Sequence, residues 1–396
     1  MATLLTIDEP PRSAPRGFAL FALGFRPFYL LASIFAALSI PLWALQFSGL
    51  LARPYLAGPV WHAHEMLFGF TLAVIVGFLF TAGRNWSNQP TPAGWKLAAL
   101  AALWIAGRVL VLTPWAVPAA AVNVLFPLLA AIGLGVPFFK ARNKRNYFFV
   151  GLLALLSLAA AVVHLSQLGL IRSPAWLGLQ AALDMVLFII AVMSGRVVPM
   201  FTNNGVPGAH ATRHPAVEKV ALGAILALLA VDASGLRGWP TAALAAVASL
   251  AHAWRWLLWQ PLKTRRVPLV WVLHLAYAWI PIHLLLRALG ELGWVNPSLA
   301  IHALTVGAIG GLVIGMMTRT AKGHTGRALR ADRHETACYV LVALAAVVRV
   351  LVPLVAPAQT IHAVLCSAVL WSAGFGLYAV RYWPILSRPR LDGRAG

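Results

Sequence analysis

Long, uninterrupted apolar runs are the feature of this sequence that most restricts its fold. Leu72 to Phe80 and Leu152 to Val163 contain no charged residue, whereas a strand of a membrane β-barrel alternates polar and apolar side chains. A helix of about 20 apolar residues crosses a bilayer. Of the 396 residues, 61% are hydrophobic and 10% are charged. The sequence therefore predicts an all-α, polytopic membrane helical bundle that leaves little length for soluble domains.

Proline, glycine and basic clusters divide the apolar runs into about twelve predicted transmembrane helices. They span 27–46, 60–82, 95–113, 116–138, 146–169, 175–198, 216–232, 239–258, 268–288, 298–320, 335–353 and 359–383. The division gives an N-terminal segment at 1–26, a transmembrane domain at 27–383 and a tail at 384–396. Pro199, Gly205 and Gly323 are interpreted as helix terminators after the sixth and tenth helices.

The basic residues test this division, because cytoplasmic loops carry an excess of Lys and Arg. The N-terminal segment, the loops after even-numbered helices and the tail hold 25 of the 31 Lys and Arg residues, and the loops after odd-numbered helices hold four. Both termini are therefore predicted to be cytoplasmic. The net charge of +21 is then explained by topology and by contact with anionic membrane lipid, and no nucleic acid partner is expected.

A histidine followed by small residues occurs twice, 238 residues apart. The two sets are His64 with Gly69, Ala73 and Gly77, and His302 with Gly307, Gly311 and Gly315. A second motif, Arg-Val-Leu-Val, begins at Arg108 and again at Arg349, 241 residues later. The chain can accordingly be divided into three four-helix units, of which the middle one lacks these motifs.

Small residues at this spacing let a neighbouring helix approach closely. In a regular helix His64 and His302 point away from their small-residue stripes and lie near the predicted periplasmic ends of their helices. His62 and His64 diverge by about 200° round the helix axis. At most one of them is therefore expected to face the same cavity as His302.

Histidines gather at one predicted depth of the bundle. Those in the periplasmic third of their helices are His62, His64, His164, His283, His302 and His362, while His252 and His274 lie deeper. With few carboxylates nearby, neutral imidazoles are typical ligands of haem iron or copper. The alternative for each one is a packing residue that is simply hydrogen-bonded. His274 and His283 are about 180° apart on one helix, so they are expected to face different sites.

Charged side chains inside predicted spans are the other candidates. Arg108 and Arg349 could bind the propionates of a haem through bidentate contacts, could extend to the membrane interface, or one of them could pair with Glu65. Asp184 could be a proton or cation relay, or could make a hydrogen bond to a neighbouring helix.

Five sequence strings are similar to those of one known family. They are GFRPFY at 24–29, WHAHEM at 61–66, MSGRVVPMFTN at 193–203, HALTVGAIG at 302–310 and TRTAKGHTGR at 318–327. Together they closely resemble the NnrS family over nearly the whole chain. The resemblance implies a bacterial inner-membrane protein that contains haem, expected to be b-type, and copper, and that is associated with denitrification and nitric oxide stress. Whether it is an oxidoreductase that metabolises nitric oxide stays open.

The predicted plan also looks like the catalytic subunit of haem-copper oxidases, in which helices 2 and 10 supply haem ligands and helices 6 and 7 supply copper ligands. Their repeat equivalence, shared depth and common orientation make His64 and His302 the expected haem ligands, with His62 as the next candidate on helix 2, and the oxidase plan is an architectural analogy only. The sequence departs from the plan because its helices 6 and 7 contain no histidine. The leading candidates for copper ligands are then His164, His274 and His283.

Such a centre would bind nitric oxide or turn it over. Turnover also needs an electron donor, either another protein or a quinol. The alternative function is a secondary transporter of a small molecule or metal complex, because repeats and broken helices also mark transporters. Visible absorption of the purified protein separates the two functions.

Overall fold

The computed structural model describes residues 17–47 and 54–393, and all of its regular structure in these ranges is helical. Its long helices are α1 (Phe25–Phe47), α2 (Gly58–His64) with α3 (Leu72–Ser87), α4 (Trp95–Leu110), α5 (Ala116–Lys140), α6 (Tyr147–Gln167), α7 (Ala175–Gly205), α8 (Pro215–Ser234), α9 (Trp239–Leu258), α10 (Pro268–Glu291), α11 (Pro297–His302) with α12 (Gly311–His324), α13 (Arg333–Val355) and α14 (Thr360–Ser387). The all-α prediction is confirmed. Positions 1–16 of the predicted N-terminal segment and 394–396 of the tail lie outside the described residues.

Nine helical stretches among the described residues are long and apolar enough to cross a membrane. The three other predicted spans correspond to α4, which has 16 residues, and to α8 and α9, which have 20 residues each. The chain is therefore a membrane protein. A count of twelve spans, and their grouping into three units, stay predictions.

Two residues that were interpreted as helix terminators, Pro199 and Gly323, lie inside helices instead. Pro199 lies inside α7, which continues to Gly205, and Gly323 lies inside α12. Helix α14 runs through Pro384 to Ser387, beyond the predicted boundary at 383. A proline removes one backbone donor, and in a membrane bundle neighbouring groups satisfy the carbonyl that this frees, so the helix can continue.

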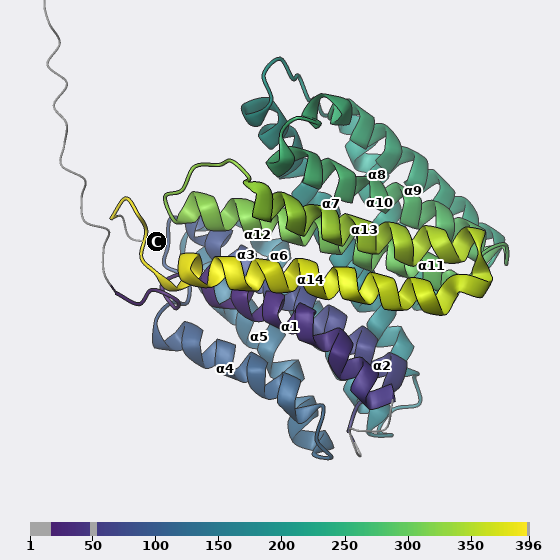
Figure 1. Ribbon diagram of the computed structural model, residues 1–396. Coiled ribbons are helices and arrows are strands. Elements are labelled where there is room, and N and C mark those ends of the chain that lie inside the picture. Colours follow the sequence, from purple (N-terminus) through teal and green to yellow (C-terminus); the bar gives the residue numbers. More distant parts are fainter. Residues whose placement is uncertain (1–16, 48–53, 394–396) are drawn as a thin grey trace, which may run out of the picture.

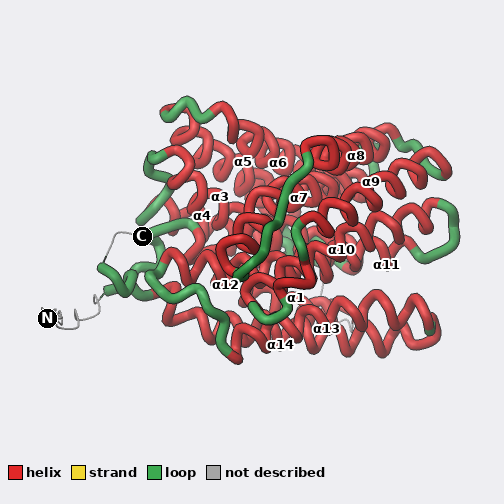
Figure 2. The backbone as a smooth tube through the Cα atoms, turned by 90° about the horizontal axis from the view of Figure 1, so that it is seen from above, coloured by secondary structure: helices red, strands yellow, loops and turns green. Residues whose placement is uncertain are grey.

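Both ends of the described chain lie at the same end of the bundle (Figure 1). The backbone nitrogen of Ala19 donates to the carbonyl oxygen of Ser387 over 2.8 Å. We call this the terminal end of the bundle. The opposite end, where α2 and α11 begin, is called the distal end (Figure 1), and Figure 2 shows the same bundle from above, with helices as its only regular structure.

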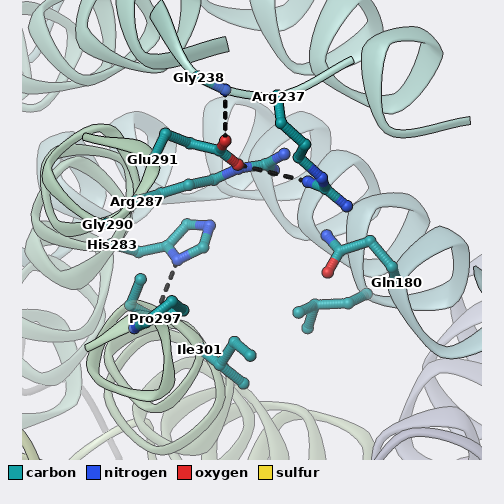
Figure 3. A pocket seen from close by; sticks show the side chains of 11 residues that line it. Gln180, Arg237, Gly238, His283, Arg287, Gly290, Glu291, Pro297 and Ile301 are labelled. Carbon is teal, nitrogen blue, oxygen red and sulfur yellow. Dashed lines mark hydrogen bonds and ion pairs between the residues drawn. The ribbon is translucent and has the colours of Figure 1, made fainter. Parts of the chain in front are cut away.

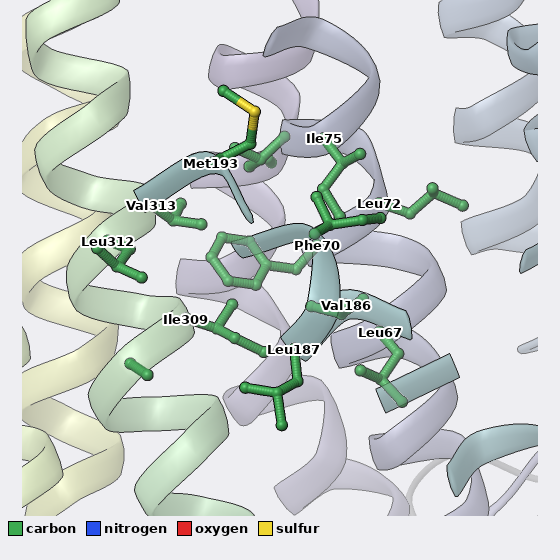
Figure 4. Close-up of a cluster of buried hydrophobic side chains, with 14 of the residues drawn as sticks. Leu67, Phe70, Leu72, Ile75, Val186, Leu187, Met193, Ile309, Leu312 and Val313 are labelled. Atoms are coloured by element: carbon green, nitrogen blue, oxygen red, sulfur yellow. The ribbon is translucent and has the colours of Figure 1, made fainter. Parts of the chain in front are cut away.

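The centre of the bundle is an apolar contact between α3, α7 and α12 and the segments that precede α3 and α12. Phe70, Leu187 and Ile309 meet there (Figure 4), and each is almost completely buried. This packing fixes the three helices against one another over their middle turns.

The small-residue stripes pack as predicted. A Cβ atom added at Gly77 would lie 2.9 Å from Cβ of Phe28 on α1, and one added at Gly311 would lie 2.6 Å from Cβ of Ala276 on α10. Only a glycine allows this approach of the two backbones. The stripe prediction is confirmed for both helices.

A π-helical segment interrupts both histidine-bearing helices. It spans Glu65–Thr71 between α2 and α3, and Ala303–Gly310 between α11 and α12. Each segment begins directly after its histidine. The two copies of the motif, 238 residues apart, therefore share a backbone conformation as well as a sequence pattern. Segments of this kind often mark functional sites, and they shift the side chains before them relative to those after them.

Candidate metal centre

His64 and His164 form the closest pair of histidines described at the distal end. His64 ends α2 and His164 lies in the last turn of α6. Their exposed fractions are 0% and 1%, and their ring centres are 4.9 Å apart at an interplanar angle of 72°. Within the described residues, neither Nε2 atom has a hydrogen-bond partner. Two buried imidazole nitrogens are thus left without a partner beside one another.

The other nitrogen of each ring is held by a neighbour. Nδ1 of His64 lies 2.7 Å from Oε1 of Glu65, and Nδ1 of His164 lies 3.1 Å from the hydroxyl of Tyr55. The Tyr55 hydroxyl also donates to the backbone oxygen of His164 over 3.3 Å, so its oxygen can accept from Nδ1. Both rings then carry their proton on Nδ1, which leaves a lone pair on each Nε2, the form that binds a metal ion.

The spacing of the two rings suits a bent arrangement of ligands. With metal–nitrogen bonds of about 2 Å, two imidazoles on opposite sides of a metal place their ring centres about 6 Å apart. The observed 4.9 Å is shorter, and the rings are nearly perpendicular. The described part of the chain brings together no group of three or more His, Cys, Asp or Glu residues suited to a metal ion. The pair could therefore offer two nitrogen ligands to a metal ion.

Arg108 reaches this pair through Glu65. Its Nε lies 2.9 Å from Oε2 of Glu65, and its Nη2 donates to Oδ1 of Asn123. Its guanidinium also lies over the ring of Trp104, 5.4 Å from the ring centre. The predicted pairing of an intramembrane arginine with Glu65 is confirmed. Because Glu65 contacts both Arg108 and His64, it links the guanidinium charge to the orientation of the ring.

A second distal cluster is built around His302. Its Nδ1 lies 2.7 Å from the backbone oxygen of Ser298 and its Nε2 lies 3.2 Å from Nη2 of Arg349. Arg349 also donates to the hydroxyl of Ser298 over 3.4 Å and lines a cavity of about 240 Å³. No carboxylate lies within 4 Å of its guanidinium in the described ranges. Arg108 and Arg349 thus each serve the histidine of their own repeat, one through Glu65 and one directly.

His62 belongs to the His302 cluster and not to the His64 pair. Its ring stacks on Trp43 with ring centres 4.8 Å apart, and it is close enough to interact electrostatically with Arg349 and His302. Its buried Nδ1 has no hydrogen-bond partner among the described residues. The structure therefore bears out the prediction that His62 and His64 diverge. It also joins His64 to His164 and His302 to Arg349, so the two repeat-equivalent histidines share no partner.

The remaining candidate histidines lie in other places. Nε2 of His274 lies 2.8 Å from the hydroxyl of Thr202, whereas Nδ1 of His283 lies 2.8 Å from the backbone oxygen of Ala300. The expectation that these two face different sites is confirmed. His252 contacts Tyr277 and a backbone oxygen through its two nitrogens, as expected for a packing residue.

Asp184 has partners on other helices. Its Oδ1 accepts from Gln180 over 3.0 Å and lies 3.4 Å from Nη1 of Arg287, which also binds Asp232. Of the two interpretations of Asp184, the hydrogen-bonded one is confirmed. The relay role stays a prediction.

Sequence reasoning missed Tyr55, Arg287 and Asp232. Tyr55 lies in a loop, outside the helical pattern that directed attention to histidines. Arg287 and Asp232 lie at the ends of the predicted spans 268–288 and 216–232, and an arginine and an acid at the same predicted depth were a usable signal.

Comparison with known proteins identifies a family that covers nearly the whole chain. A family model described as NnrS protein matches residues 19–390. A search of curated proteins found no match.

Proposed function

Because the chain belongs to the NnrS family, we propose that it is a haem- and copper-binding protein of the bacterial inner membrane that binds or turns over nitric oxide. Both termini lie in the cytoplasm in this proposal, which makes the distal end periplasmic. The observation that carries it is the pair of buried Nε2 atoms of His64 and His164, which have no partner in the described residues. A family link to the nitric oxide response supports the choice of ligand.

Copper fits the His64 and His164 pair in chemistry and in spacing. Imidazole nitrogen is a good ligand of copper, and bound copper would supply an open coordination position for a diatomic ligand. Glu65 and Tyr55 fix both rings by their Nδ1 contacts, as neighbours of metal-binding histidines usually do. The buried ring of Phe68, whose centre is 5.1 Å from that of His64, adds an apolar neighbour to the pair.

Haem enters the proposal from the family resemblance. One Nε2 atom binds one metal, so copper at His64 excludes the predicted haem ligation by His64. We therefore place haem at the His302 cluster, with His62 as the candidate on helix 2. Arg349 would release His302 and bind a propionate, since a carboxylate is a stronger partner for a guanidinium than a neutral imidazole is.

Metal analysis and visible spectroscopy of the purified full-length protein test the proposal directly. We expect copper by elemental analysis, b-type haem by the pyridine haemochrome assay, and a shift of the haem absorption when nitric oxide is added. A protein with neither a Soret band nor copper would contradict the proposal. A transporter of a small molecule or metal complex would then be the remaining function.

Replacing Arg349 is expected to weaken haem binding without removing the axial ligand. A charge-assisted hydrogen bond contributes about 1.5 to 3 kcal/mol, so Arg349→Ala should lower haem affinity by about ten- to a hundredfold. Arg349→Lys keeps the charge but loses the planar fork and should restore affinity only in part. Haem titration of the apoprotein measures both effects.

Arg381→Ala is the matched control, because this half-exposed arginine is on α14 and pairs with Asp332. It should leave haem affinity unchanged. Full haem affinity in Arg349→Ala would contradict a propionate contact of Arg349.

A further inference from the structure

A cavity at the distal end lies apart from the His64 pair. It has a volume of about 400 Å³ and is lined by residues of α7, α10, α11 and the turn between α8 and α9. This volume is within the range of about 300 to 1,000 Å³ found for small-molecule sites. Figure 3 shows His283, Gln180 and Arg287 projecting toward it.

His283 presents a hydrogen-bond acceptor to this cavity. Its exposed fraction is 3%, and its Nδ1 lies 2.8 Å from the backbone oxygen of Ala300, so the proton is on Nδ1. Nε2 therefore carries a lone pair. It has no partner among the described residues and points into the cavity (Figure 3). A buried polar atom without a partner costs stability, which a ligand with a hydrogen-bond donor would relieve.

Gln180 presents a second acceptor from the other side of the cavity. Its amide nitrogen lies 3.0 Å from Asp184 and 3.4 Å from Asp232. Because the nitrogen faces two carboxylates, the amide oxygen is the atom left to face the cavity. Two acceptors on opposite walls call for a ligand with a donor at each end.

Charge around the cavity disfavours an anion. Arg287 and Arg237 bind the carboxylates of Asp184, Asp232 and Glu291, so two guanidinium groups face three carboxylates. Both cations are already paired with acids. The spare carboxylate gives the cluster a capacity to take up a proton.

The rest of the lining is apolar and lies at an end of the bundle. Leu183, Pro297 and Ile301 line the cavity, and Trp294, next to α11, is largely exposed as in an aromatic belt at a membrane interface. The cavity thus lies near the expected membrane interface, where a ligand that partitions into the bilayer is available.

We propose that this cavity binds the headgroup of a membrane quinol, with one ring hydroxyl donating to Nε2 of His283 and the other to the amide oxygen of Gln180. A quinol carries two donors at opposite ends of a flat ring and is held in the membrane by its tail. The oxidised quinone carries acceptors at the same two positions. A site with two acceptors therefore prefers the reduced form and releases the oxidised one.

The role of the bound quinol as electron donor rests on the proposed function. Oxidation of one quinol breaks two O–H bonds and yields a quinone, two protons and two electrons. One proton passes to Nε2 of His283 and the other to the carboxylate cluster of Asp184 and Asp232. A copper ion or haem held at the proposed metal centre would supply the oxidant that accepts the two electrons one at a time.

Binding measurements on the purified full-length protein in lipid nanodiscs test this inference. The probes are a short-chain ubiquinol, titrated anaerobically, and the matching ubiquinone. We expect the quinol to bind at least tenfold more tightly, because the quinone loses both hydrogen bonds. His283→Phe and Gln180→Leu should each reduce this preference at least threefold, and the exposed His362→Phe on α14 should not.

Equal affinity of the unchanged protein for quinol and quinone would overturn the inference, whatever the variants do. So would an unchanged preference in both variants while circular dichroism shows them folded. Copper and haem are measured in the same preparations. Intact metal with no quinol preference contradicts this inference alone, whereas a quinol preference without metal contradicts only the proposed function.

Discussion

His64→Leu and His164→Leu are each expected to lower the copper affinity of the purified protein by more than about a hundredfold. Each change removes one of two nitrogen ligands, whereas losing a neighbour that only orients a ligand costs about ten- to a hundredfold. Glu65→Gln, which keeps the shape but weakens the contact with Nδ1 of His64, should fall in that smaller range. Competition with a copper chelator of known affinity measures all three.

The order of these effects distinguishes ligands from packing residues. His362→Leu is the control, because His362 is an exposed histidine near the distal end. If both ring variants retain the copper affinity of the unchanged protein, the pair is not the copper site. His274, whose Nδ1 has no partner in the described ranges, would then be examined next.

Glu218→Ala is expected to destabilise the fold by about 3 to 5 kcal/mol, the cost of leaving a buried charge without its partner. Arg255, which is 1% exposed, donates to both carboxylate oxygens of Glu218 over 2.7 Å. Its other contacts, with Ala191 and Tyr277, are to neutral oxygens and do not replace the lost charge. Reversible unfolding in mixed detergent micelles gives the free energy of unfolding.

A surface ion pair supplies the comparison. Arg381 and Asp332 are 3.0 Å apart but half-exposed, so Arg381→Ala should cost less than about 1 kcal/mol. If Glu218→Ala lowers the free energy of unfolding no more than Arg381→Ala does, the buried pair of Glu218 and Arg255 stabilises the fold no more than a surface pair.

Features that depend on one helix at a time were predictable from the sequence. Apolar runs gave the helices, and the spacing of Gly77 and Gly311 gave the faces that pack on α1 and α10. The divergence of His62 and His64 also follows from helical geometry alone. In each case the relevant residues lie within a few turns of one another, so the period of the helix is sufficient.

Features that depend on contacts between helices were not predictable. The pairing of His64 with His164 depends on how α2 and α6 meet, and no period in the sequence encodes that. Arg287 finds its acids on α7 and α8, at Asp184 and Asp232, more than 50 residues away. Glu65 was an exception, because the scarcity of acids in the spans left few partners for Arg108.

Each π-helical segment, after His64 or His302, separates the part of its helix that packs against a neighbour from the part that carries the histidine. Close packing at Gly77 against Phe28 holds the terminal half of the helix in place, while the rotation of the distal half is set by the number of residues between the two halves. Loss of one residue within 65–71 would turn His64 by about 100° about the helix axis and take it away from His164. The length of this segment, and not only the identity of its residues, therefore maintains the contact between His64 and His164, so a single-residue insertion or deletion there would separate the two rings without changing either histidine.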